Sequence, residues 1–107
     1  MVIDVFADWC LPCKELDHQT FTDDAVKKEA TRFVTLKLNL TSNDPDTEAG
    51  RARKQFGIVG VPTVIFLDAG GEEHSGLRLT GFENADRFLD RLKKVPVASP
   101  ADAGLLQ

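Results

Sequence analysis

The sequence predicts an α/β domain built around a central mixed sheet of four strands, with helices on both faces. Two segments, residues 2–7 and 63–67, are apolar on both sides, which is typical of strands in the middle of a covered sheet. Two others, residues 33–40 and 77–80, alternate between apolar and polar residues, as edge strands do. Helical patterns separate these segments. We therefore expect the spatial order 33–40, 2–7, 63–67, 77–80, with the first three strands parallel and the last one returning antiparallel.

The first two helices follow the first strand. A helix over residues 11–19 places Pro12 in its first turn, where no backbone N–H is missed. The second helix is expected to begin at Thr22 as its N-cap and to end near Thr31.

The third and fourth helices are also marked by their end residues. Asp44 is expected to cap the third helix with Pro45 at its first helical position, and Gly57 is expected to end it. The last helix begins after an N-cap at Asn84. Its apolar residues share one face at helical spacing and are Ala85, Phe88, Leu89 and Leu92.

Size and composition bound the function. The 107 residues predict one domain over residues 1–95, followed by a flexible tail over 96–107. The net charge of −4 argues against nucleic acid or an anionic membrane surface as a partner. No apolar run is long enough to span a bilayer, and the chain opens on a core strand, so we expect no signal peptide and no membrane insertion of this chain. We expect a monomer, and the start at Met1 indicates an excised domain or a naturally short protein.

Cys10 and Cys13, the only cysteines, lie where the first strand turns into the first helix. A Cys-x-x-Cys motif in this position is a redox signature, because the helix dipole favours the thiolate of the first cysteine and the second lies close enough to form a disulfide. The two alternatives are an inert pair and half of a metal site. Neither His18 nor His74 has a common zinc-site spacing, so we expect no metal and no cofactor.

Acidic residues surround the motif. Asp4 lies in the buried first strand, and Asp8, Glu15 and Asp17 are close to the cysteines in sequence. Negative charge and burial raise the pKa of a thiol and oppose the helix dipole, so a dithiol in this setting gives up electrons readily. The pattern therefore favours a reductant. Asp4 is a candidate proton carrier for Cys13, and a polar group satisfied inside the core is the alternative.

Two motifs resemble the thioredoxin superfamily: Asp4-x-x-Ala7-Asp8-Trp9-Cys10-x-x-Cys13-Lys14 and Gly60-Val61-Pro62-Thr63. Within it, the sequence is most similar to the family of C-terminal periplasmic domains of the thiol:disulfide interchange protein DsbD. The closer cues are Thr20-Phe21, Asn39-Leu40-Thr41, Asn43-Asp44 and Thr80-Gly81-Phe82. The resemblance covers about residues 2 to 95 and implies a thioredoxin-like fold that lacks the usual N-terminal strand and helix. The Leu-Pro pair between the cysteines departs from the DsbD pattern.

The resemblance also implies site residues. It implies a cis peptide bond before Pro62, with the Val61 backbone available to pair with an extended partner segment beside Cys10. Trp9 would offer a docking surface, and an ordinary interfacial aromatic residue is the alternative. The carboxylate of Asp17 would tune the redox properties of the cysteine pair. The alternative is an exposed surface residue with no role in the site.

The implied activity is that of a periplasmic protein-disulfide reductase in an electron relay connected with cytochrome c biogenesis. Electrons would come from a membrane-embedded thiol domain and pass to a periplasmic domain. A free-standing general thioredoxin is the first alternative. A redox-inactive peptide-binding module is the second, from a different functional class.

Overall fold

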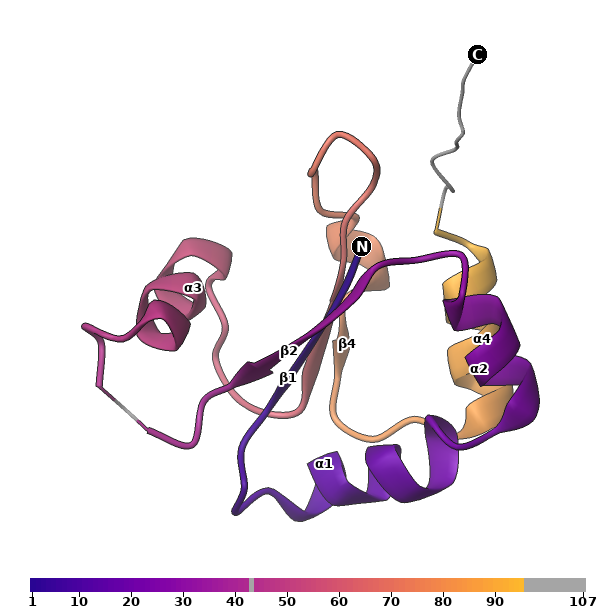
Figure 1. The fold of residues 1–107 in the computed structure, drawn as a ribbon, viewed down its shortest axis with the longest axis horizontal. Coiled ribbons are helices and arrows are strands. Elements are labelled where there is room, and N and C mark those ends of the chain that lie inside the picture. The colour runs from indigo at the N-terminus through magenta and orange to yellow at the C-terminus, as the bar shows by residue number, and fades with distance from the viewer. Residues whose placement is uncertain (43, 96–107) are drawn as a thin grey trace.

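The computed structural model describes residues 1–42 and 44–95, so the tail predicted over residues 96–107 lies outside the described part. The chain runs through strands and helices in the predicted order (Figure 1). The elements are β1 (Val2–Phe6), α1 (Leu11–Glu15), the π-helical turn η1 (Leu16–Thr20), α2 (Asp24–Ala30), β2 (Thr35–Asn39), α3 (Glu48–Phe56), β3 (Thr63–Phe66), the 3-10 turn η2 (Ser75–Leu77), β4 (Leu79–Thr80) and α4 (Ala85–Lys93).

The four strands form one mixed sheet in the order β2-β1-β3-β4, which confirms the predicted arrangement. The predicted direction of the third strand was wrong, because β3 runs antiparallel to β1 while β2 runs parallel to it. The register explains the difference. Phe6 pairs with Asn39 at the end of β2, and Val5 pairs with Thr63 at the start of β3. The connection between β2 and β3 thus leaves and re-enters the sheet at the same end. β3 therefore runs in the opposite direction to β2.

Helices cover both faces of the sheet, as predicted. α3 lies on one side, and α2 and α4 lie together on the other, with α1 at the end of the sheet where β1 stops (Figure 1). One core cluster includes Phe66, Phe88 and Leu92 and fills the side of α2 and α4. A second includes Ile65 and Ile58 on the side of α3. All four residues of β3 are buried, whereas β2 is largely exposed, so the two strands are central and peripheral as their patterns indicate.

The first two helices begin one residue or less from the predicted positions. The helical backbone continues from α1 through the widened turn η1 to Thr20. α2 is capped by Asp23, whose carboxylate accepts hydrogen bonds from the backbone N–H groups of Ala25 and Val26, so the prediction of Thr22 was wrong. The Thr22 hydroxyl instead donates to the His18 carbonyl at 2.7 Å, which turns this side chain back toward the preceding helical turn.

The start of α3 also differs from the prediction. Thr47, rather than Asp44, is the N-cap, and its hydroxyl accepts a hydrogen bond from the Gly50 N–H at 2.9 Å. Pro45 lies in the preceding turn, where the Asp44 carboxylate accepts from the Asp46 N–H and holds the chain in a non-helical conformation. Gly57 ends α3 in the left-handed region (φ 62°), as predicted, and the predicted Asn84 cap of α4 is confirmed.

Across residues 1–42 and 44–95, none of the helices combines the length and the apolar character that crossing a membrane requires.

Candidate active site

Cys10 and Cys13 lie at the start of α1. Cys10 is the N-cap residue in an extended conformation, and its Sγ accepts a hydrogen bond from the Cys13 N–H at 3.2 Å. The two residues form a disulfide with their Cα atoms 5.3 Å apart. Each residue is only 3% exposed. The pair therefore has the predicted placement, with the first sulfur directed at the unpaired N–H groups of a helix N-terminus.

The cysteines pack against the loop that precedes β3. Together with Ala7 they form a small buried cluster, against which Phe6 and Val61 pack. The peptide bond between Val61 and Pro62 is cis, as the resemblance implied. Pro62 is buried, and its neighbour Val61 packs against the cluster that contains both cysteines.

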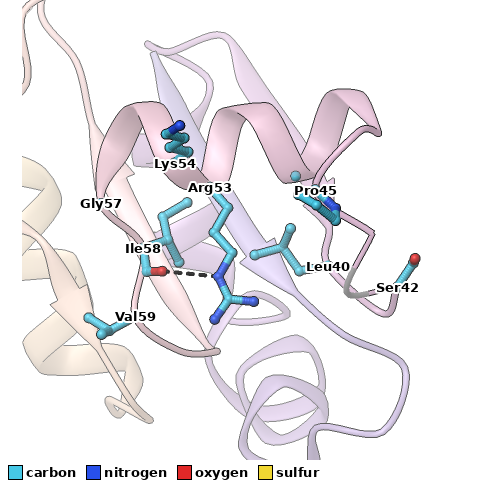
Figure 2. Close-up of a pocket in the computed structure, with 9 residues that line it drawn as sticks. Leu40, Ser42, Pro45, Arg53, Lys54, Gly57, Ile58 and Val59 are labelled. Atoms are coloured by element: carbon cyan, nitrogen blue, oxygen red, sulfur yellow. Dashed lines mark hydrogen bonds between the residues drawn. The ribbon is translucent and has the colours of Figure 1, made fainter.

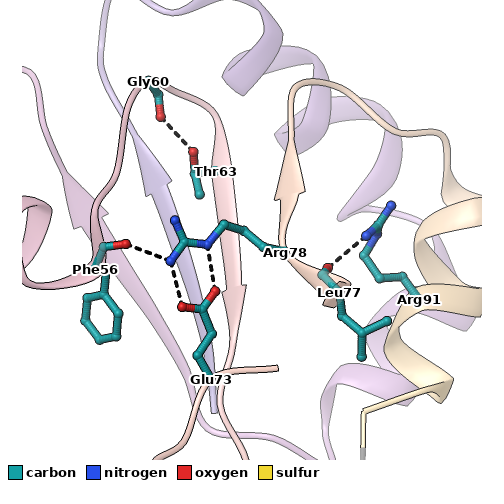
Figure 3. Close-up of polar contacts among 7 residues, drawn as sticks. All are labelled: Phe56, Gly60, Thr63, Glu73, Leu77, Arg78 and Arg91. Atoms are coloured by element: carbon teal, nitrogen blue, oxygen red, sulfur yellow. Dashed lines mark hydrogen bonds and ion pairs between the residues drawn. The ribbon is translucent and has the colours of Figure 1, made fainter. Parts of the chain in front are cut away.

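Hydrogen bonds hold this loop in place from both of its ends (Figure 3). The Thr63 hydroxyl donates to the Gly60 carbonyl at 2.7 Å. The Arg78 guanidinium donates to the Phe56 carbonyl at 2.7 Å and to both carboxylate oxygens of Glu73 at 2.6 Å. The hydrogen bonds of Arg78 join the end of α3 to the segment that leads into β4. They therefore fix the loop between these two elements.

Asp4 and Asp17 are brought together by a lysine. The Lys37 Nζ lies 3.5 Å from the Asp4 Oδ2 and 3.3 Å from the Asp17 Oδ1. The Asp4 side chain is 13% exposed, and burial raises its pKa above the ordinary value, as predicted. The charge of Lys37 lowers the pKa of Asp4 and the charge of Asp17 raises it, so the burial effect is only partly offset.

Sequence reasoning missed the role of Lys37. The residue belongs to the polar side of the alternating segment 33–40, where an exposed lysine is ordinary. Asp4 and Lys37 are direct partners in the register of β1 and β2. The sequence predicted that the two strands are neighbours. It did not predict the register that places Lys37 opposite Asp4.

Trp9, the residue before Cys10, lies on the surface. Trp9 is 67% exposed. Together with Val61 it lines a hollow of about 250 Å³. Leu11 and Val59 are also strongly exposed, at 67% and 87%. The redox pair is thus bordered by apolar surface.

The comparison with known families follows from this geometry. A family model described as a thioredoxin-like domain matches residues 1–96. The chain belongs to the thioredoxin-like family. The thiol:disulfide interchange protein DsbD of Yersinia pestis (strain Pestoides F) is 35% identical over 99 residues, which are 92% of this chain and 16% of that protein. This thioredoxin-like chain therefore spans a small part of the length of the curated relative that it matches.

Solved structures of the DsbD C-terminal domain from Neisseria meningitidis are similar to this chain over 90% of its length. The reduced form matches with a TM-score of 0.78 and 28% identity, over 90% of this chain and 80% of that one. The oxidised form matches with a TM-score of 0.79 over 90% and 79%. The predictions of a thioredoxin-like fold and of a likeness to the DsbD C-terminal domain are confirmed. They support the predicted thiol:disulfide oxidoreductase activity.

The metal alternative finds no support in the described residues, where no group of three or more histidine, cysteine or acidic side chains is placed to hold an ion. Cys10 and Cys13 are bonded to each other.

Proposed function

We propose that this chain is a protein-disulfide reductase that passes electrons through Cys10 and Cys13 to disulfides in partner proteins. The observation that carries the proposal is the Cys10–Cys13 pair at the N-terminus of α1, packed against Val61 beside the cis Pro62. The likeness to DsbD C-terminal domains supports the direction of transfer.

The reaction requires two exchanges. The Cys10 thiolate attacks a disulfide of the partner, forming a mixed disulfide and releasing one partner thiolate. The Cys13 thiolate then attacks the Cys10 sulfur, which releases the second partner thiolate and leaves the Cys10–Cys13 disulfide. The partner disulfide is reduced to two thiols and the dithiol of this chain is oxidised. Asp4 takes the proton of Cys13 in this scheme, because its raised pKa suits it to proton transfer.

The charges around the cysteines refine the predicted direction. Asp4 precedes the cysteines in β1 and Asp17 follows Cys13 by one helical turn, and negative charge near a thiol favours the dithiol. Lys37 lies between the two carboxylates and cancels part of their charge. Lys37 is 57% exposed, so solvent weakens its effect. We therefore expect a reducing pair whose potential is set by the balance of these three charges.

The partners follow from the same proposal. Trp9 and the backbone of Val61 would contact an extended segment of the partner while Pro62 shapes the loop. A membrane-embedded thiol domain would reduce this chain, and a periplasmic domain would receive its electrons. The chain would act in the periplasm as a monomeric domain, held by transient and small interfaces.

Two measurements test this proposal. Equilibration in thiol buffers gives the potential of the Cys10–Cys13 couple, and a value near that of strong oxidants, about −120 mV, would contradict a reductant. A Cys13→Ser variant should trap partners as mixed disulfides, and Cys10→Ser is the matched control that should not. Capture of a few periplasmic thiol proteins supports the relay.

The alternatives have their own outcomes. Capture of many unrelated proteins would favour a general thioredoxin. Failure to trap any partner would favour the redox-inactive binding module.

A further inference from the structure

Two adjoining hollows extend from the redox site along α3. The first, of about 250 Å³, is lined by Trp9 and Val61. The second, of about 490 Å³, lies between α3 and the segments on either side of it (Figure 2). Both hollows are lined by Leu40, Arg53 and Val59. They therefore adjoin each other, and together we call them the α3 groove, which begins next to Trp9, the residue before Cys10.

Arg53 occupies the middle of the α3 groove. Its side chain extends from α3 toward the loop that carries Ile58, and its Nε donates to the Ile58 carbonyl at 3.2 Å (Figure 2). A guanidinium has five N–H donors. The other four find no acceptor within the described residues, and no carboxylate there lies within 4.0 Å of the group. By contrast, Arg78 and Arg91, whose side chains are largely buried, are each paired with a glutamate.

The charge of the α3 groove has one sign. Neither hollow is lined by an acidic residue, and Lys54 adds a second positive charge beside Arg53. The net charge of the whole chain is −4, so this groove is a local exception. Its walls are partly apolar and include Leu40 and Ile58, which are buried. A guanidinium held against apolar walls forms stronger hydrogen bonds with a carboxylate than it does in open water.

We propose that Arg53 makes the α3 groove a subsite for a glutamate or aspartate on the partner segment that carries the disulfide. The inference rests on the proposed function and specifies the partner's chemistry. An extended segment that meets Cys10 at its cysteine continues past Trp9 and Val61 into the groove. Its acidic side chain then pairs with the free edge of the Arg53 guanidinium, formed by its two terminal nitrogens. Arg53 takes no part in the sulfur exchange and acts only in choosing the partner.

Synthetic peptides test this subsite on the full chain. Each peptide carries one cysteine, capped with cysteamine through a disulfide, and has Glu, Gln or Lys at one flanking position in turn. The reduced chain converts the mixed disulfide to two thiols and becomes the Cys10–Cys13 disulfide. Chromatography of acid-quenched samples gives the second-order rate constant. At the position that reaches Arg53, we expect the Glu peptide to react about fivefold faster than the Gln peptide, and the Lys peptide to react more slowly.

Charge variants separate selection from folding. Arg53→Gln should bring the Glu-to-Gln ratio close to one, and Arg53→Glu should turn the preference toward the Lys peptide. Arg51→Gln is the matched control, because Arg51 lies on the same helix but donates to the Asp46 carbonyl outside the groove lining. It should leave the ratio unchanged. Loss of the loop contact to Ile58 would slow all peptides alike, so the ratio reports charge recognition alone. Added salt should reduce the ratio in the unsubstituted chain.

The outcomes distinguish the two proposals. Equal rates for Glu, Gln and Lys at every position, with normal reduction of all peptides, would overturn the Arg53 subsite and leave the reductase intact. A preference for Glu that survives Arg53→Gln would also overturn it. Failure of the reduced chain to react with any peptide would overturn the proposed function, and the subsite with it.

Discussion

The Lys37 Nζ lies 3.5 Å from the Asp4 carboxylate, and the two residues face each other directly across the parallel pair of β1 and β2. The acid is nearly buried and the lysine is mostly exposed, with side chains 13% and 57% accessible. An interior carboxylate beside the redox helix is thus balanced by a cation from an edge strand. Asp17 shares this cation at 3.3 Å. The charge of Lys37 lowers the pKa of Asp4 and the charge of Asp17 raises it.

Replacing Lys37 should raise the pKa of Asp4 further. In Lys37→Met the attraction that lowers this pKa is removed, whereas burial and the charge of Asp17 continue to raise it. Carbon NMR of the Asp4 carboxyl across a pH titration measures the change. Lys27→Met, an exposed substitution on α2, is the control and should leave the titration unaltered. A pKa of Asp4 that stays the same or falls in Lys37→Met would show that the lysine does not stabilise the carboxylate.

Asp4 should make stability depend on pH in a defined direction. Its pKa is raised in the folded state, so the folded chain binds this proton more tightly than the unfolded chain. The stabilisation is complete below the unfolded pKa, about 3.9, and is lost as the pH rises through the higher folded pKa.

Asp4→Asn should therefore be more stable than the parent at pH 7, by about 1 kcal/mol, and equal to it below about pH 4. Urea unfolding of the oxidised proteins at a series of pH values checks this. The control is Asp90→Asn, an exposed position on α4. A parent chain that exceeds Asp4→Asn in stability at pH 7 would contradict the burial effect.

The same substitution should slow the reaction. If Asp4 accepts the proton of Cys13, Asp4→Asn removes the base and lowers the rate of disulfide reduction at pH 7 by roughly a hundredfold. Stopped-flow measurement with a model disulfide gives the rate, and external buffer bases should restore part of it. Asp17→Asn serves as the comparison, because it changes the local charge without removing the buried acid. Equal rates in Asp4→Asn and the parent would assign Asp4 a structural role only.

The fold was predictable where burial decides it. Segment 63–67 is apolar on both sides and segment 33–40 is not, and this difference alone placed one strand centrally and the other at the edge. Hydrophobic periodicity carries no information about strand direction, so the antiparallel β3 was missed. The starts of α1 and α4 were predicted correctly, and those of α2 and α3 were missed by one and three residues. Thr22 and Asp23 are both good caps for α2, and only the hydrogen bond to His18 decides between them.

The site was predictable where the chemistry is local in sequence. Cys10 and Cys13 carry their own signature, and Pro62 was supplied by the resemblance. Lys37 and Arg53 were not found, because each acts through a contact made across the fold. The first depends on strand register, and the second on how a long side chain lies between α3 and the following loop.

Gly50 should tolerate no side chain, although it lies inside a helix. A Cβ added there would lie 2.7 Å from the Pro45 Cα and would also clash with the Asp44 carbonyl oxygen. Glycine to alanine inside a helix is ordinarily stabilising by about 1 kcal/mol. We expect Gly50→Ala to be destabilising by about 2 kcal/mol instead, because backbone atoms must move. Urea unfolding measures this against Gly76→Ala, where an added Cβ meets open space. A stabilised Gly50→Ala would contradict the close packing of α3 on the preceding turn.

The Arg78–Glu73 ion pair should contribute more to stability than the more exposed ion pair between Arg32 and Glu29. Both side chains are about four-fifths buried, at 20% and 18% exposed, and Arg78 also donates to the Phe56 carbonyl. Arg78→Met leaves the Glu73 carboxylate without its partner in a poorly solvated site, so we expect a loss of about 2–3 kcal/mol in the free energy of unfolding. The double variant with Glu73→Gln should lose less than the sum of the single variants, because no unpaired charge remains.

Arg32→Met is the control for this comparison. Arg32 pairs with Glu29 one helical turn away, but the pair is more exposed, so its loss should cost about 0.5 kcal/mol or less. Urea unfolding of the oxidised proteins gives the free energy of unfolding of the parent chain, of each single variant and of the double variant. If Arg78→Met and Arg32→Met lowered the free energy of unfolding equally, the contacts of Arg78 with Glu73 and Phe56 would add no more to stability than an exposed ion pair. Additive single and double variants would mean that Arg78 acts through Phe56 rather than through Glu73.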